Sequence, residues 1–250
     1  MNEAPLKLIK KLHKTKTSKD EGLCIVEGRK CVHEAFHKQS CAYLLITQGN
    51  LSEFEQYKHK TKFYIVDEND LKEISQFNQP EGVLGVFNRP LLSKEPPKGQ
   101  NGEIHLALFQ WNDPNNIGSS IRTAHGLGIK SITLIGNSPD ALSAKVIRTS
   151  MASTFHLPLH HIEDLSQFNK DNWHILYAEL GGLTIEHQQK IHTKKPILLC
   201  MGSESHGFSP IIPPKKQCIS IPIKETLDSY SAPIAAAILM HHLKHCISEV

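Results

Sequence analysis

The sequence has no long hydrophobic run, no paired cysteine motif and no large excess of either charge, and each absence narrows the possibilities. No apolar run in the 250 residues approaches the ~18 residues of a membrane helix, and the polar start does not resemble a signal peptide. The six cysteines form no C-x-x-C pair, a pattern typical of reduced thiols inside the cell. We therefore expect a cytoplasmic protein without a membrane partner.

The charge is more informative in its distribution than in its total. The formal net charge is +3, so no partner follows from the sum alone. The first twenty residues, however, carry six lysines against only Glu3 and Asp20: Lys7, Lys10, Lys11, Lys14, Lys16 and Lys19. Such a run is either a solvated helix face or a surface that contacts a nucleic-acid backbone.

Alternating strand and helix patterns divide the chain into two α/β regions. In residues 1–90 we expect strands at 23–26, 43–47, 63–66 and 82–87, with helices at 5–14, 28–37 and 68–77. Residues 91–102 are rich in proline and glycine and are typical of a linker. In residues 103–250 we expect strands at 104–111, 131–135, 173–177, 197–201 and 219–223, with helices at 116–127 and 231–247. This pattern predicts a mostly parallel second sheet with helices on both faces.

Two of these strands end in irregular loops of the size that binds ligands. The apolar strand 197–201 leads into residues 202–207, which have a glycine at each end. The strand 219–223 contains Pro222, which indicates that its pairing stops there. The two loops are expected to meet in one crevice, where open α/β sheets usually bind ligands.

The first helix of the second region is well marked at both ends. Asn112 or Asp113 can cap its start, and Gly128 can end it. Arg122 and Gly118 are expected on the same polar face of this helix. Because glycine has no side chain, Arg122 would extend past helix backbone that is exposed at Gly118. This arginine either covers the helix with its aliphatic stem or binds an anionic ligand.

Three segments of the second region carry a pattern that is more specific than any of these features alone. They are DPNNIGSSIRTAHGLGI (residues 113–129), MGSESHGFS (201–209) and IPIKETLDSYSAPIAAAIL (221–239). In this order they resemble the three motifs of the SpoU or TrmH-type branch of the SPOUT RNA methyltransferases. Residues 1–90 also resemble that family's L30e-like substrate-binding domain, notably at residues 26–28 and 80–84. The motifs are specific for the family but not for the substrate.

The resemblance implies both a fold and a reaction. The fold is α/β and mostly parallel, with a carboxyl-terminal segment threaded into a trefoil knot, and the methyltransferase domain forms a homodimer. The reaction transfers a methyl group from S-adenosylmethionine to a ribose 2′-hydroxyl of structured RNA, either tRNA or rRNA. DNA is not an expected partner, because it lacks this hydroxyl group. The alternative is a non-catalytic or weakened RNA-binding relative that keeps the fold.

The resemblance also assigns site residues by position. The cofactor is expected at Gly202, Ile221 and Tyr230, where tyrosine replaces the usual leucine. The expected catalytic residues are Arg122, Ser229, Ser231, Asn116 and Glu204. The pKa of an arginine makes proton abstraction hard, so we expect Arg122 to hold a phosphate, whereas Asn116 and Glu204 hold the loops. RNA contacts are expected from Lys10, Lys11, Lys14, Lys16, Arg29 and Arg122.

The sequence departs from the family pattern at several positions. Ser231 stands where asparagine is usual, Pro233 where a second serine is usual, and residues 151–152 lack a common glycine. The lost amide removes hydrogen-bonding groups at the target ribose, which keeps the RNA-binding alternative open. In the last helix Ile234, Ile238 and Leu239 are expected in the core, and the remainder could serve a dimer interface.

Two other kinds of site are less consistent with the sequence. Ser205 lies in S-E-S-H-G, which lacks the first glycine of a hydrolase nucleophile elbow, and no helix is expected behind it. His241 and His245 are spaced i, i+4, but no further ligands accompany them, and a second histidine group around Pro158 is not helical. We predict no metal site.

Overall fold

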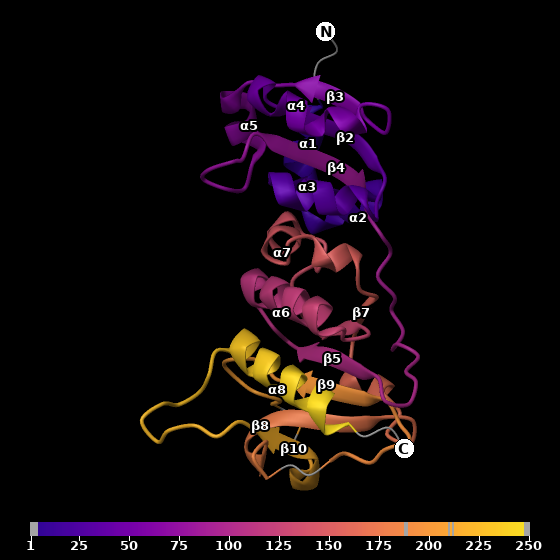
Figure 1. Cartoon of the computed structure of the whole chain (residues 1–250), viewed down its shortest axis with the longest axis vertical. Coiled ribbons are helices and arrows are strands. Elements are labelled where there is room, and N and C mark those ends of the chain that lie inside the picture. Colours follow the sequence, from indigo (N-terminus) through magenta and orange to yellow (C-terminus); the bar gives the residue numbers. More distant parts are fainter. Residues whose placement is uncertain (1–4, 188–189, 210, 212, 248–250) are drawn as a thin grey trace. The chain divides into compact units, whose positions relative to one another are not determined.

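The computed structural model describes residues 5–187, 190–209, 211 and 213–247, and the chain forms two compact units (Figure 1). The first unit comprises the residues up to Leu91 together with Asp140–His156. The second comprises Leu92–Pro139 and the residues from Leu157 onward. The sequence predicted a single division at residues 91–102, so the structure differs in placing residues 140–156 with the first unit.

The first unit contains a mixed four-stranded sheet in the order β1-β4-β2-β3, in which only β2 and β3 are parallel. Its strands are β1 (Leu23–Glu27), β2 (Cys41–Ile46), β3 (Lys62–Ile65) and β4 (Val83–Asn88). Its helices are α1 (Leu6–Leu12), α2 (Thr15–Glu21), α3 (Arg29–Phe36), α4 (Leu51–Phe54), α5 (Glu68–Ile74) and α7 (Ala144–Thr149). The sequence pattern did not predict α2, α4 and α7, because helices of one or two turns carry little periodicity.

Residues 140–156 join the first unit through a buried ion pair and through packing. The guanidinium of Arg89, which follows β4, donates two hydrogen bonds of 2.9 and 2.7 Å to the carboxylate of Asp140. Both side chains are 5% exposed or less. Ser143 then caps α7, which contacts β1, and Ala144 enters the hydrophobic core of this unit. Tertiary contacts therefore decide this boundary.

The second unit contains a six-stranded sheet in the order β10-β8-β9-β5-β6-β7, in which every pair is parallel. Its strands are β5 (Ile104–Phe109), β6 (Ile132–Ile135), β7 (Leu159–Ile162), β8 (His174–Thr184), β9 (Ile197–Met201) and β10 (Cys218–Ser220). The prediction of an α/β fold with a mostly parallel sheet is confirmed. β7 was not predicted, and β8 continues seven residues past its predicted end at Tyr177. β10 ends before Pro222.

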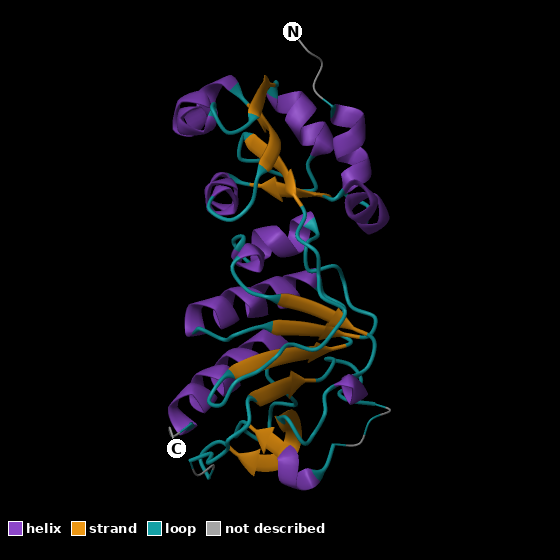
Figure 2. Ribbon diagram, turned by 90° about the vertical axis from the view of Figure 1, so that its right-hand side faces the viewer, coloured by secondary structure: helices purple, strands orange, loops and turns teal. Residues whose placement is uncertain are grey.

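The two faces of this sheet are covered differently. The helices α6 (Pro114–Leu127) and α8 (Ala232–Cys246) contact each other and lie on one face (Figure 2). Aromatic side chains cover the other face together with the short 3-10 helix η4 (Leu165–Gln167), and Phe168, Trp173 and Phe208 are buried there. In the described part of the second unit the α-helices α6 and α8 therefore lie on one face only, and the predicted second helical layer is replaced by aromatic side chains and a short 3-10 helix.

Local sequence explains the ends of α6. The carboxylate of Asp113 accepts a hydrogen bond of 2.9 Å from the backbone N–H of Asn115, which settles the cap between the two candidates. Gly128 ends the helix with φ of 71°, in the left-handed region that glycine adopts without strain. Gly118 is buried. The prediction that the helix backbone is exposed to solvent beside Arg122 is therefore wrong.

None of the helices in the described part of the chain combines the length and the apolar composition that a membrane crossing requires.

Candidate functional site

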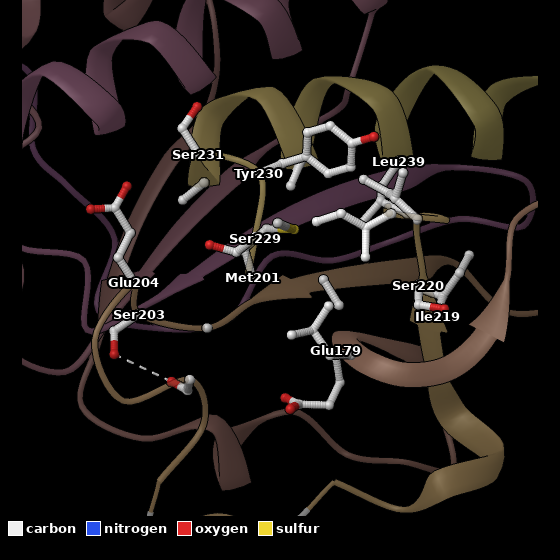
Figure 3. A pocket seen from close by; sticks show the side chains of 18 residues that line it. Glu179, Met201, Ser203, Glu204, Ile219, Ser220, Ser229, Tyr230, Ser231 and Leu239 are labelled. Atoms are coloured by element: carbon white, nitrogen blue, oxygen red, sulfur yellow. Dashed lines mark hydrogen bonds between the residues drawn. The ribbon is translucent and has the colours of Figure 1, made fainter. Parts of the chain in front are cut away.

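A cavity of about 560 Å³ lies at the carboxyl ends of β9 and β10, against the middle of β8 and beside the start of α8 (Figure 3). Its walls come from three segments: the middle of β8, the loop after β9, and the connection from β10 into α8. They are lined by Ala178, Glu179, Leu180, Met201, Gly202, Ser203, Glu204, Gly207, Ile219, Ser220, Ile221, Ile223, Ser229, Tyr230, Ser231, Ala232, Ala235 and Leu239. The two loops that the sequence placed at strand ends therefore do meet in one cavity.

The loop after β9 is tightly closed. Ser203 and Gly207 exchange two backbone hydrogen bonds, each of 2.9 Å. A Cβ atom at residue 202 would lie 2.7 Å from the carbonyl carbon of Gly207, closer than real Cβ atoms come, so only glycine fits there. The indole N–H of Trp111, which follows β5, donates a hydrogen bond of 2.9 Å to the carbonyl of Gly202. The loop presents its backbone to the cavity in a fixed shape.

The connection from β10 to α8 supplies the opposite wall with Ile221, Ser229, Tyr230 and Ser231. The Tyr230 hydroxyl donates a hydrogen bond of 3.3 Å to the carbonyl of Pro222 and closes this connection on itself. Ser231 occupies the N-cap position of α8, but its hydroxyl makes no capping hydrogen bond. The Ser231 side chain is therefore available to a ligand.

The charge of the lining points to the kind of ligand that fits. Two glutamates, Glu179 and Glu204, line the cavity, and none of the residues that line it is a lysine, arginine or histidine. The remaining wall is largely apolar, with Met201, Ile219 and Leu239. This lining suits a ligand with positive charge and a flat apolar part. Glu179 was not predicted as a site residue, because its strand was expected to end at Tyr177 and Glu179 lies beyond that end.

A second cavity of about 430 Å³ lies beside the first, at the start of α6. Its lining includes Ser203 and Glu204, which also line the first cavity. The other residues that line it are Gln110, Trp111, Asn112, Asp113, Pro114, Asn116 and Ser205. The side-chain amide of Asn116 donates a hydrogen bond of 2.6 Å to Oε1 of Glu204, so the first and second motifs are joined directly.

The structure brings together most of the residues predicted for the site. Gly202, Glu204, Ile221, Ser229, Tyr230 and Ser231 all line the first cavity, and Asn116 lines the second. Arg122 lines neither of these cavities; it is exposed on α6 and makes no ion pair or hydrogen bond within the described part of the chain. The structure therefore does not place Arg122 with the other candidates in a single chain.

The predicted RNA-binding residues of the first unit are all exposed. Lys10 forms an ion pair with Glu73. Arg29 lies 3.4 Å from the carboxylate of Glu53, and its backbone N–H donates a hydrogen bond to Glu81. Lys11, Lys14 and Lys16 lie on or between α1 and α2.

The rival sites gain no support from the geometry. Ser205 lies 2.7 Å from the imidazole of its neighbour His206, but both are exposed, and among the described residues no α-helix begins directly behind them. The rings of His241 and His245 have their centres 4.7 Å apart and are tilted by 59°. The described residues contain no group of three or more histidine, cysteine, aspartate or glutamate side chains that could hold a metal ion.

Cys200 lies in the buried strand β9. Burial raises the pKa of its thiol, which disfavours the thiolate form.

Comparison with known proteins identifies the family. A model of the SpoU rRNA Methylase family matches residues 103–241, more than half of the chain. The chain belongs to the SpoU rRNA methylase family. A model of the MRM3-like substrate binding domain matches residues 3–85, which confirms a substrate-binding domain ahead of the methylase domain. The resemblance in the three motifs is thus confirmed.

Individual relatives agree with this assignment. This SpoU methylase is 23% identical to the 23S rRNA (guanosine(2553)-2′-O)-methyltransferase RlmP of Bacillus subtilis, over 94% of each chain. A putative RNA methyltransferase of the TrmH family from Porphyromonas gingivalis has a TM-score of 0.81 and 27% identity, covering 98% of this chain and 99% of its own. An AdoMet-bound rRNA methyltransferase from Sinorhizobium meliloti has a TM-score of 0.83 at 22% identity, covering 98% and 95%.

Family membership fixes the class of reaction and the cofactor. The protein is an RNA methyltransferase, and S-adenosylmethionine is the methyl donor of SpoU methylases. The first cavity fits this cofactor, because S-adenosylmethionine carries a positive sulfonium and an ammonium group beside a flat adenine. The carboxylates of Glu179 and Glu204 match the charges, and the apolar wall matches the adenine.

Proposed function

We propose that this SpoU methylase transfers a methyl group from S-adenosylmethionine to a ribose 2′-hydroxyl of tRNA or rRNA. The observation that carries the proposal is the hydrogen bond between Asn116 and Glu204, which joins a second, polar cavity to the cavity that fits the cofactor. S-adenosylmethionine supplies a methyl group that is already electrophilic. The protein then mainly has to align the hydroxyl with it, and alignment provides most of the acceleration in such a reaction.

In this proposal the cofactor is held mainly by backbone groups. Gly202 lets the loop after β9 lie close to the ligand, and Ile221 and Tyr230 present the backbone of the opposite wall. The Tyr230 side chain is turned to Pro222, so a backbone role for this position tolerates tyrosine in place of leucine.

The polar residues around the two cavities orient the ribose. Ser229 and Ser231 line the first cavity, and the Ser231 hydroxyl makes no capping bond in α8. Asn116 and Glu204 hold the motifs together. The exposed guanidinium of Arg122 is assigned to an RNA phosphate, which it can bind through two parallel hydrogen bonds.

The first unit is assigned to RNA recognition, in an L30e-like domain. Lys10, Lys11, Lys14, Lys16 and Arg29 are exposed and suit phosphate contacts that depend on shape and charge. Such contacts select a structured RNA rather than a base sequence. A cytoplasmic location, where tRNA and rRNA are available, belongs to the same proposal.

The proposal includes a homodimer formed through the methyltransferase domain and a trefoil knot in that domain. Leu227 and Ile234 are 50% and 53% exposed near the cavity, although Ile234 was predicted to be in the core. A groove beside α6 and α8 on the same unit is lined by Thr123, Leu127, Ile185, Ala237, Ile238, His241, His242 and His245. A second copy would cover these surfaces and could bring its Arg122 to the site. The position of β9 between β5 and β8 in the sheet supports the trefoil knot.

Calorimetry and a transfer assay test this function. S-adenosylmethionine should bind the purified protein, and the loaded protein should methylate total RNA from cells that lack the gene. Binding of RNA without any methyl transfer would instead favour the non-catalytic relative, with Ser231 and Pro233 as the positions to examine.

A further inference from the structure

Two carboxylates line the first cavity, and they are in different situations. Glu204 already accepts a hydrogen bond of 2.6 Å from the side-chain amide of Asn116. Glu179, in the middle of β8, is exposed, and its side chain makes no hydrogen bond or ion pair within the part of the chain that the structure describes. The negative charge of Glu179 is therefore available to a ligand.

The Glu179 carboxylate lies beside the loop after β9. Its Oε2 atom is 3.9 Å from the position that a Cβ of Gly207 would take. Gly207 also lines the cavity, and it exchanges two backbone hydrogen bonds of 2.9 Å with Ser203. Figure 3 shows Glu179 and Tyr230 on opposite sides of the cavity. The free charge therefore belongs to the side of the cavity that this loop forms.

The same loop is where the two cavities adjoin, because Ser203 and Glu204 line both of them. In the proposed reaction the methyl group leaves the cofactor cavity at this junction. The sulfonium that carries the methyl group is therefore expected beside the loop, on the same side of the cavity as the Glu179 carboxylate. The ammonium group of the cofactor is at the far end of the methionine chain, next to the cofactor's own carboxylate.

The rest of the lining makes this charge effective. None of the residues that line the cavity is a lysine, arginine or histidine, so no cation of the lining competes for Glu179. Met201, Ile219 and Leu239 make much of the wall apolar, and charges are screened less beside apolar groups than in water. A sulfonium has no N–H or O–H group to donate. A carboxylate therefore attracts it through charge, which a neutral amide of the same shape does not supply.

We infer that Glu179 is a specificity-determining residue that distinguishes the charged cofactor from its neutral thioether product, S-adenosylhomocysteine. The inference rests on the proposed function, which places the cofactor in this cavity. In the transfer the bond between sulfur and the methyl carbon breaks, and its electron pair stays on sulfur. The methyl carbon bonds to the ribose oxygen, whose proton leaves. The sulfur thereby loses its positive charge while the ammonium keeps its own, so Glu179 favours binding of the cofactor over retention of the product.

Calorimetry with three ligands isolates the charge on Glu179. Glu179→Gln keeps the size of the side chain and removes its charge. The matched control is Glu225→Gln, which removes the same charge from an exposed residue between β10 and α8 that does not line the cavity. The ligands are S-adenosylmethionine, S-adenosylhomocysteine and sinefungin, an analogue that carries a protonated amine where the cofactor carries the methylated sulfur. Because no RNA is added, the measurement does not depend on the acceptor.

Glu179→Gln should bind S-adenosylmethionine and sinefungin about tenfold more weakly than the wild type. Its affinity for S-adenosylhomocysteine should be nearly unchanged, which also shows that the cavity is intact. Glu225→Gln should bind all three ligands as the wild type does. An equal loss for all three ligands in Glu179→Gln, or an unchanged affinity for S-adenosylmethionine, would overturn the inference and leave the proposed function standing. A wild-type protein that binds none of the three would overturn the proposed function, and the inference with it.

Discussion

The carboxylate of Glu204 accepts a hydrogen bond of 2.6 Å from the side-chain amide of Asn116, across 88 positions of sequence. This contact joins the start of α6 to the loop after β9. Asn116→Ala should therefore lower kcat by about tenfold, because it releases a loop shared by both cavities, with little loss of stability at an exposed site. The matched measurement is a double-mutant cycle with Glu204→Gln. If the two substitutions act independently, so that their effects on kcat multiply, the contact does not position the loop.

Gly202→Ala should abolish cofactor binding. The added Cβ would meet the backbone of Gly207, which cannot move without opening the loop after β9. Gly126→Ala is the control, since a Cβ there meets nothing within 4 Å and alanine favours the helix. Calorimetry with S-adenosylmethionine should show binding to the control and none to Gly202→Ala. Equal affinity in the two variants would contradict this role for the loop.

The stability of the protein should fall in mild acid because of His105. This side chain is 2% exposed, lies 2.7 Å from the Ser131 hydroxyl, and has its pKa lowered by burial to about 4, against the opposing effect of Glu103. Below pH 6.5 His105 is therefore protonated in the unfolded chain, whereas in the folded chain it stays neutral until the pH approaches 4. The contribution of neutral His105 is complete above pH 6.5 and is lost as the pH falls through this window.

Urea unfolding at pH 6.5 and pH 5 measures this effect. The His105→Gln variant should lose about 1 to 2 kcal/mol less than the wild type over this interval, since it removes the titrating group. Parallel losses in the two proteins would show that other groups cause the acid sensitivity.

The buried pair of Arg89 and Asp140 should be important for the stability of the first unit. Asp140→Asn leaves the arginine charge buried without its partner, which typically costs about 3 to 5 kcal/mol. Lys10→Ala breaks an exposed pair with Glu73 and should cost about 1 kcal/mol or less. Chemical unfolding of both variants checks the difference. Similar losses would mean that the buried pair does not hold residues 140–156 to the unit.

The part of the site that lies in loops directly after strand ends could be predicted from the sequence. Gly202, Ile221 and Ser231 follow strand ends, and parallel strands bring their carboxyl ends to one edge of a sheet, so their meeting could be expected. Glu179 was missed because β8 continues past Tyr177, which depends on pairing with β10 and not on its own pattern. Gln110, which lines the second cavity with a φ of 52°, could not be found from the sequence either, because the surrounding structure imposes this backbone conformation.

The boundaries of the units were less predictable for the same reason. Residues 140–156 follow β6 in the chain, and tertiary contacts such as the Arg89–Asp140 pair and the packing of α7 on β1 assign them to the first unit. The exposure of Ile234 was also wrongly predicted, because an apolar residue on a helix face shows the same pattern whether its own chain or a second chain covers it.

Alkaline hydrolysis of RNA labelled by this enzyme shows whether the methyl group is on the ribose or on a base. A methylated 2′-hydroxyl cannot attack the neighbouring phosphate, so the bond beside it resists alkali. Tritium from the S-adenosylmethionine methyl group should appear in alkali-resistant dinucleotides, and Arg122→Ala should form none while binding the cofactor normally. Label recovered in mononucleotides would place the methyl group on a base and would contradict transfer to a ribose 2′-hydroxyl.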